Sequence, residues 1–81
     1  MLGQDRTLIK GTVTDALTGE PLTGATVYVK GESVNATAAG LDGSFQLYVS
    51  KKNTLIVCSL IGYIEQTVLF DGKELNIRLE E

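Results

Sequence analysis

Short runs of alternating apolar and polar residues recur along the whole chain, and this period of two constrains the fold more than any other feature. Side chains two residues apart lie on the same face of a β-strand, so each run predicts a strand with one buried face. Turn residues, glycine above all, separate the runs every several positions. No segment shows a sustained helical period. The sequence therefore predicts an all-β fold.

The runs predict seven short strands, at residues 8–14, 25–30, 34–38, 44–49, 54–60, 63–70 and 74–80. The residues expected to face inward are Ile9, Val13, Ala25, Val27, Val29, Phe45, Leu47, Val49, Leu75, Ile77 and Leu79. The run at 54–60 is apolar on both faces, as in a central strand covered on two sides or packed under a partner. Seven short strands in a compact chain predict an antiparallel β-sandwich with Greek-key connections.

The length and composition fit one small domain. An 81-residue chain with 43% hydrophobic and 21% charged residues can build a single core, with little room for an enclosed active site. We expect residues 7–81 to form this domain and residues 1–6 to be disordered or added by cloning. The longest apolar run, residues 55–58, is far too short to span a bilayer, so the domain itself is not expected to insert into a membrane. No signal-like leader opens the chain, so any signal for export is expected to have been removed.

The charge and the residue types that are missing exclude several functions. A net charge of −3 would repel phosphate backbones, so nucleic acid is not an expected partner. The chain has no histidine, which removes the commonest general base and the commonest zinc ligand. The single cysteine, Cys58, lies in the middle of an apolar run and is expected to be a buried, unreactive thiol.

Four carboxylates, those of Asp15, Glu20, Asp42 and Asp71, are candidates for acid–base or calcium-binding groups. Asp42 and Asp71 each precede a glycine, as tight turns require, and Glu20 follows one. No EF-hand series is present, although a looser calcium site remains an alternative. No catalytic, cofactor-binding or metal-binding residue is therefore assigned, and no cofactor is expected.

Three further features are candidates for binding elements. The segment 18–24, with Gly19, Pro21 and Gly24, is interpreted as a structural corner between strands. Tyr28 and Tyr48 are expected to face outward, where they could contact a sugar or a protein, although exposed tyrosines on strands are common. Residues 35–37 match the N-glycosylation pattern, which matters only in a eukaryotic secreted protein.

Four motifs occur in a defined order: G-T-V-T-D at 11–15, G-E-P-L-T-G-A-T-V at 19–27, D-G-S-F-Q-L at 42–47 and S-L-I-G-Y at 59–63. Together they resemble the carboxypeptidase-regulatory-like domain, in particular the N-terminal extension of SusC-like TonB-dependent outer-membrane transporters of Bacteroidetes. The matching residues with fold-level roles are Pro21, Gly24, Gly43, Phe45, Gly62 and Tyr63. The chain departs from the family pattern at two places: residues 39–40 are Ala–Gly where Thr–Asp is frequent, and Leu60 stands where Tyr is usual.

The resemblance implies a transthyretin-like (prealbumin-like) seven-stranded sandwich without catalysis. It implies a periplasmic location, ahead of the plug and barrel of a glycan or peptide importer. The implied partners are periplasmic proteins or the parent transporter chain, with carbohydrate as an alternative ligand. Because the chain stops at Glu81, an excised domain or a small stand-alone relative is expected.

These observations lead to one favoured function and two alternatives. The favoured function is a non-catalytic periplasmic accessory domain of a TonB-dependent nutrient transporter. The first alternative is a cell-surface module of an adhesin or glycan-degrading enzyme that binds carbohydrate or protein. The second, a hydrolase of the transthyretin-like kind, is disfavoured because those enzymes depend on histidines.

Overall fold

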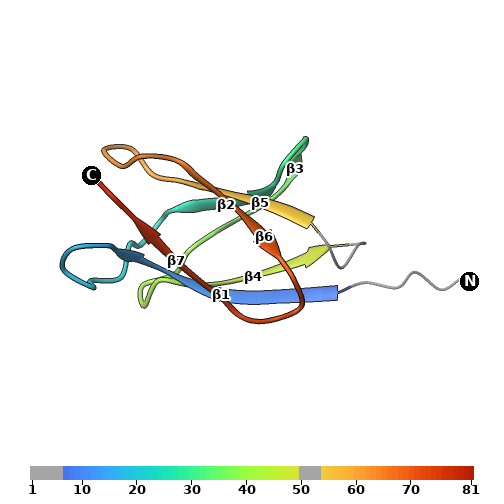
Figure 1. Ribbon diagram of the computed structural model, residues 1–81, viewed down its shortest axis with the longest axis horizontal. Coiled ribbons are helices and arrows are strands. Elements are labelled where there is room, and N and C mark those ends of the chain that lie inside the picture. The colour runs from blue at the N-terminus through green and yellow to red at the C-terminus, as the bar shows by residue number, and fades with distance from the viewer. Residues whose placement is uncertain (1–6, 50–53) are drawn as a thin grey trace, which may run out of the picture.

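The strands expected from the alternating runs are present in the structure, a computed structural model that describes residues 7–49 and 54–81 (Figure 1). They are β1 (Thr7–Asp15), β2 (Thr26–Val29), β3 (Glu32–Ala38), β4 (Ser44–Val49), β5 (Thr54–Ser59), β6 (Gln66–Phe70) and β7 (Leu75–Leu79). The predicted all-β sandwich of seven strands is confirmed. Residues 1–6, expected to be disordered or added by cloning, lie outside the described residues. No helix in the described part of the chain is long and apolar enough to cross a membrane.

Two strands begin more than one residue away from the predicted position, and both of these differences follow a turn glycine. β3 begins at Glu32 rather than at residue 34, directly after Gly31, whose φ is 85°. β6 begins at Gln66 rather than at residue 63, because the Tyr63 N–H donates to the Leu60 carbonyl at 3.0 Å and closes a turn. A backbone group used in such a turn is no longer available to the sheet.

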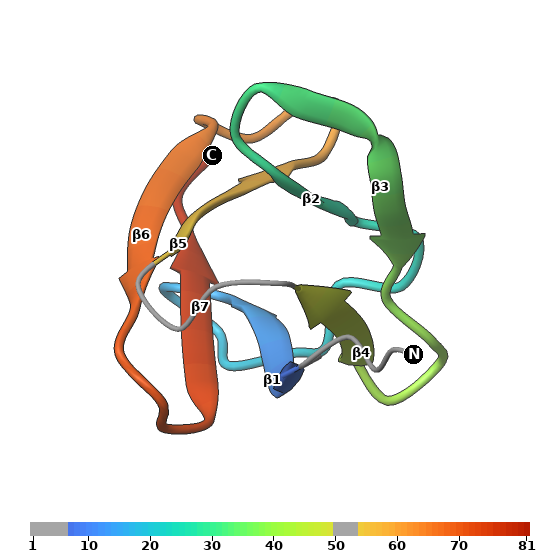
Figure 2. The ribbon, with the colours of Figure 1, turned by 90° about the vertical axis from the view of Figure 1, so that its right-hand side faces the viewer.

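The strands form two sheets, with the orders β4-β1-β7 and β3-β2-β5-β6. Figure 2 shows these sheets as two layers that face each other. The pairings are antiparallel as predicted except for one, because β1 and β7 are parallel, in a register that joins Gly11 to Leu75 and Asp15 to Leu79. A parallel pair requires a long connection, and the five strands between β1 and β7 provide it.

The core is one cluster of buried apolar side chains between the sheets. All the residues predicted to face inward are buried except Leu75, which is half-buried and packs against the cluster. Gly11 has a specific role there, because a Cβ at this position would lie 2.7 Å from the Phe45 ring and would contact the Leu75 carbonyl oxygen. The aromatic ring thus occupies the space that a side chain on β1 would need.

β5 is covered on its inner face and only in part on its outer face. Ile56 and Cys58 are fully buried in the core. On the outer face Val57 is 3% exposed, between Tyr28 of β2 and the neighbouring residue of β6, whereas Leu55 is 44% exposed. The prediction of a strand covered on two sides therefore holds at Val57 and fails at Leu55, which lies closer to the end of the strand.

Three connections gather at one end of the sandwich, together with the last residues of the chain. We call this the loop end and define it as residues 16–25, 39–43, 60–65 and 80–81. It lies on the left in Figure 1, opposite the N-terminus. Because β1, β3, β5 and β7 end here, the loop end brings together segments that are far apart in the sequence.

Candidate interaction surface

Asp15, the last residue of β1, accepts three hydrogen bonds at the loop end. Its Oδ1 accepts the backbone N–H groups of Leu17 at 2.8 Å and Thr18 at 2.9 Å. Its Oδ2 accepts the hydroxyl of Tyr63 at 2.7 Å. The first two bonds close a turn of the Asx type after β1, and the third ties the connection 60–65 to the end of that strand. An ionised carboxylate only accepts hydrogen bonds, and all three contacts use Asp15 as the acceptor.

These contacts shift the pKa values of both side chains. The Thr18 N–H, followed by the Tyr63 hydroxyl and the Leu17 N–H, lowers the pKa of Asp15 below its ordinary value. The hydrogen bond to Asp15 holds the proton on the phenol and raises the pKa of Tyr63 to about 12. At neutral pH the pair is therefore a charged carboxylate and a neutral phenol. Such a carboxylate is a weak base, so the geometry indicates a structural link rather than a proton-transfer pair.

Backbone hydrogen bonds also tie the connections of the loop end to one another. The N–H of Ile64 donates to the carbonyl of Glu80 at 2.6 Å, which joins the connection 60–65 to the chain after β7. The N–H of Gly24 donates to the carbonyl of Ala39 at 2.9 Å, which joins the first connection to the one that precedes β4. The side chains displayed by these connections are therefore held on a defined backbone.

The segment 18–24 is a structural corner, as the sequence predicted. It carries the chain from the sheet of β1 to the sheet of β2, and Gly19 and Gly24 take φ values of 78° and 85°. Pro21 packs against Gly43, where a Cβ would lie 2.6 Å from the Val13 carbonyl oxygen and 3.0 Å from the Pro21 Cβ. Pro21 and Gly43, which belong to two separate motifs, therefore lie against each other. This close packing leaves no room for a side chain at position 43.

The other carboxylates considered from the sequence stabilise turns. Asp42 accepts the Ser44 N–H at 3.0 Å and the Ser44 hydroxyl at 2.6 Å, and these bonds lower the pKa of Asp42. Asp71 accepts the Lys73 N–H at 3.3 Å, and the carboxylate of Glu20 lies 3.5 Å from the Thr18 hydroxyl. The glycines that follow Asp42 and Asp71 take φ values of 79° and 103°, so the turn interpretation of both pairs is confirmed. Within residues 7–49 and 54–81, no three Cys, Asp or Glu side chains form a group that could hold a metal ion.

Cys58 is fully buried in the core, and its burial raises the pKa of the thiol to about 11. A thiol is nucleophilic only as the thiolate, which is scarce at neutral pH when the pKa is this high. The prediction that Cys58 is buried and unreactive is thus confirmed.

Tyr28 and Tyr48 lie on opposite layers and do not form a common surface. Tyr28 is half-buried on the outer face of β2, and Tyr48 is 54% exposed on β4 of the other sheet. Next to Tyr48, the side-chain amide of Asn35 donates to the Tyr48 carbonyl at 3.0 Å, so the first residue of the glycosylation-like motif has a partner within the fold.

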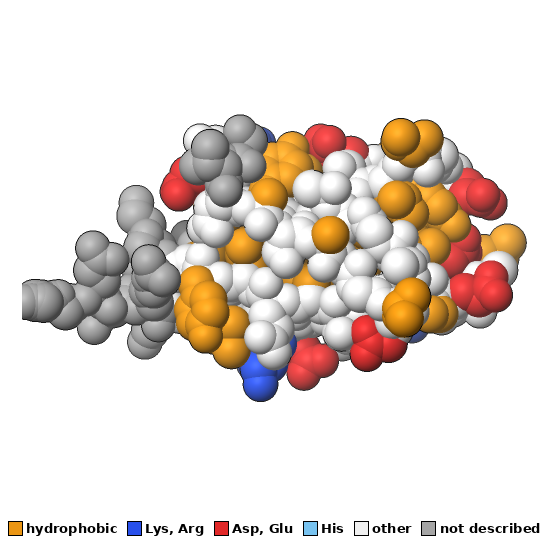
Figure 3. Space-filling model, turned by 180° about the vertical axis from the view of Figure 1, so that it is seen from behind, with side chains coloured by type: hydrophobic (Ala, Val, Ile, Leu, Met, Phe, Trp, Pro, Cys, Tyr) orange, Lys and Arg blue, Asp and Glu red, His pale blue; other side chains and the backbone are white. Residues whose placement is uncertain are grey.

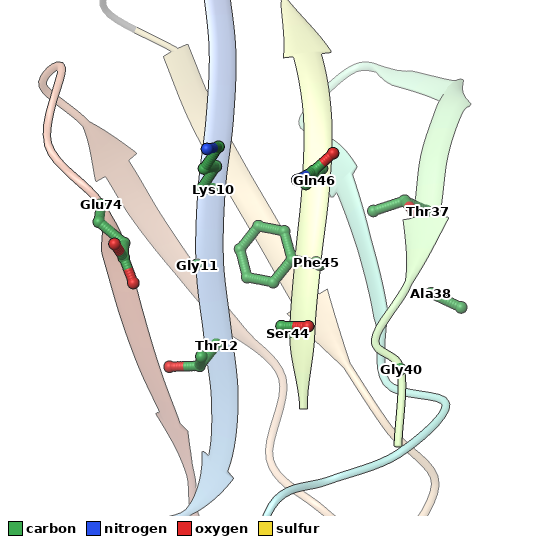
Figure 4. A pocket seen from close by; sticks show the side chains of 10 residues that line it. All are labelled: Lys10, Gly11, Thr12, Thr37, Ala38, Gly40, Ser44, Phe45, Gln46 and Glu74. Atoms are coloured by element: carbon green, nitrogen blue, oxygen red, sulfur yellow. The ribbon is translucent and has the colours of Figure 1, made fainter. Parts of the chain in front are cut away.

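A shallow hollow lies across β1, β3 and β4 (Figure 4). Its lining combines the hydroxyls of Thr12, Thr37 and Ser44 with the amide of Gln46 and parts of Lys10, Gly11, Ala38, Gly40, Phe45 and Glu74. The Thr12 hydroxyl donates to the Asn76 side chain at 3.1 Å. These hydroxyls have no histidine to activate them, since the chain contains none. The polar side chains that line the hollow could each form a hydrogen bond with a ligand, but they are not arranged as a nucleophile with its base.

Four large aliphatic side chains of the loop end point into solvent. They are Leu17 at 92% exposed, Leu41 at 87%, Ile61 at 99% and Ile64 at 59%. Each of the three connections contributes at least one of them. Figure 3 shows orange hydrophobic and red acidic side chains interleaved at the end of the molecule opposite the grey atoms.

The same end carries a one-sided charge. The loop end contains Glu20, Asp42, Glu65, Glu80 and Glu81, and no lysine or arginine. The described basic residues Lys10, Lys30, Lys73 and Arg78 lie on strands or at the opposite end. The loop end therefore combines exposed aliphatic side chains with acidic ones and carries no basic residue of its own.

With this geometry in view, the family can be assigned. The model of the CarboxypepD_reg-like domain family matches residues 9–81, and the chain belongs to this family. The resemblance drawn from the four motifs is confirmed, and the observed seven-stranded sandwich is consistent with that fold.

The chain is similar to the TonB-dependent receptor SusC of Bacteroides thetaiotaomicron. The two are 48% identical over 73 residues, which is 90% of this chain and 7% of that receptor. The chain thus spans a small part of the length of the relative it matches, and the similarity relates it to one segment of a much larger receptor.

Two features of the site were missed by sequence reasoning. The bond between Asp15 and Tyr63 joins residues that are 48 positions apart, and each closes one of the four motifs. That shared position at the motif ends was the available signal. The exposure of Leu17 and Ile61 had no such signal, because both residues lie outside the alternating runs, where no local period tells whether a side chain faces the core or the solvent.

Proposed function

We propose that this chain is a non-catalytic accessory domain of a TonB-dependent outer-membrane receptor, located on the periplasmic side and acting by protein contact. The observation that carries the proposal is the 48% identity to a segment of a receptor of this class. Identity at this level over nearly the whole domain supports a shared context as well as a shared fold.

The chemistry of the described residues supports a role without catalysis. Asp15 has a lowered pKa and is engaged with Tyr63, and Cys58 is buried with a raised pKa. A general base near neutral pH or an activated nucleophile would need the opposite shifts. The domain instead offers a sandwich whose connections are tied together by hydrogen bonds at one end.

The proposal is tested by deleting residues 9–81 from the reading frame that encodes them in the source organism. We expect nutrient uptake through the encoded receptor to fall, and the amount of receptor in the outer membrane, measured by immunoblot, gives the control for assembly. Unchanged uptake and unchanged assembly together would contradict the proposal.

The periplasmic location is tested separately by Lys30→Cys, at an exposed turn between β2 and β3. A membrane-impermeant maleimide should label this variant only after the outer membrane has been permeabilised. The matched control is the unchanged chain, whose Cys58 is buried. Labelling of intact cells would indicate the cell surface and favour the surface-module alternative.

A further inference from the structure

Several highly exposed aliphatic side chains lie together at the loop end, which is unusual for a protein surface. Single exposed leucines and isoleucines are normal on protein surfaces. Here, however, Leu17, Ile61 and Leu41 are each at least 87% exposed, and they come from three different connections at one end of the sandwich. Side chains of this kind lose contact with water most readily by binding another apolar surface.

The backbone beneath these side chains is fixed before any partner arrives. Leu17 lies within the turn that Asp15 closes and donates its N–H to the Asp15 carboxylate, and Ile61 lies in the connection that Tyr63 ties to Asp15. Ile64 is held by its backbone bond to Glu80. A surface that is already ordered loses little conformational entropy on binding, which favours affinity.

The negative charge of the loop end favours one kind of binding partner over others. A second copy presenting the same end would bring five carboxylates against five, and an anionic lipid surface would be repelled in the same way. Lysine or arginine side chains would instead meet Glu20, Glu65 and Glu80 around the aliphatic residues, with complementary charge.

We propose that the loop end binds a protein segment that carries lysine or arginine side chains together with aliphatic or aromatic ones. The aliphatic side chains of Leu17, Leu41, Ile61 and Ile64 provide the apolar contact, and the carboxylates of the loop end orient the cationic residues. This inference rests on the proposed function as a protein-contact domain and adds the surface and the chemistry of the partner.

The test uses the 81-residue chain and a library of random 12-residue peptides displayed on phage. Selected peptides are synthesised, and their binding is measured by isothermal titration calorimetry and by backbone NMR shifts. We expect the selected peptides to contain at least two basic residues and at least one large apolar residue. We expect the largest shifts at residues 16–18, 41 and 60–65.

Two double variants, one at the loop end and one matched control on the outer face of β5 and β6, show which side chains contribute to binding. L17S/I61S should weaken binding at least about tenfold, as for a central apolar contact. L55S/L69S removes two exposed leucines from the outer face of β5 and β6, where they are 44% and 57% exposed, and should leave binding unchanged. Circular dichroism and the urea midpoint establish that each variant is folded.

The charge contribution is tested in the same way. E65Q/E80Q should weaken binding several-fold, and an increase from 50 to 500 mM NaCl should weaken binding to the unchanged chain and have less effect on this variant. E32Q/E74Q changes the net charge equally at the opposite end and should have little effect.

Three outcomes would overturn the proposal: no peptide is enriched, the enriched peptides lack basic residues, or L17S/I61S binds as tightly as the unchanged chain. None of these results bears on uptake after deletion of residues 9–81. A domain needed for uptake whose loop end binds no such peptide would retain the proposed function and lose this inference.

Discussion

At the scale of single residues, the hydrogen bond from Tyr63 to Asp15 links protonation to stability. Folding lowers the pKa of Asp15, so its contribution to stability is complete above the ordinary aspartate pKa of about 3.9 and is lost as the pH falls through the lower folded value. Tyr63→Phe removes one of the bonds that favour the carboxylate. We expect this variant to be less stable at pH 7 and to have a higher Asp15 pKa.

NMR titration of the Asp15 carboxyl carbon and urea unfolding at pH 7 and pH 3 measure both effects. The loss of stability between these pH values should be smaller in Tyr63→Phe than in the unchanged chain. Tyr48→Phe, which removes an exposed hydroxyl on β4, is the control. An Asp15 pKa that is the same in Tyr63→Phe as in the unchanged chain would show that the bond does not form in solution.

Gly11 gives a second prediction for a single residue. In Gly11→Ala the new Cβ would lie 2.7 Å from the Phe45 ring and against a backbone carbonyl oxygen, which cannot move away as a flexible side chain could. We expect a destabilisation of about 1–3 kcal/mol, as for overpacked cores. Gly40→Ala is the control, because its Cβ would have ordinary contacts at 3.7 Å. Equal urea midpoints for the two variants would contradict the packing argument.

At the scale of elements, β7 completes one sheet through its parallel pairing with β1. Leu79 is fully buried at the end of this strand, and Arg78 beside it is exposed. Leu79→Ala should reduce the free energy of unfolding by about 2–5 kcal/mol through lost burial and a cavity. Arg78→Ala should change it by less than about 0.5 kcal/mol. Urea denaturation measures both, and a small effect of Leu79→Ala would mean that β7 is not packed on the core.

At the scale of the whole molecule, Cys58 reports the opening of the sandwich. It is fully buried between the sheets, and its raised pKa keeps the thiol protonated. A thiol reagent at pH 8 should therefore react with the folded chain only through unfolding, at a rate that follows stability. The loss expected for Leu79→Ala corresponds to labelling at least about 30-fold faster, since 1.4 kcal/mol is a factor of ten. Fast labelling of the unchanged chain would show that Cys58 is accessible without unfolding.

The sequence by itself determined the strands, the core and the family, because alternation with period two is a local property that any buried sheet face imposes on its residues. The inward set from Ile9 to Leu79 and the turn roles of Asp42 and Asp71 follow from such local patterns. Only the tertiary structure decided the parallel pairing of β1 with β7 and the bond between Asp15 and Tyr63. It also decided that Leu17, Leu41, Ile61 and Ile64 share one end. These features depend on how distant segments meet, and no local period encodes which loops become neighbours.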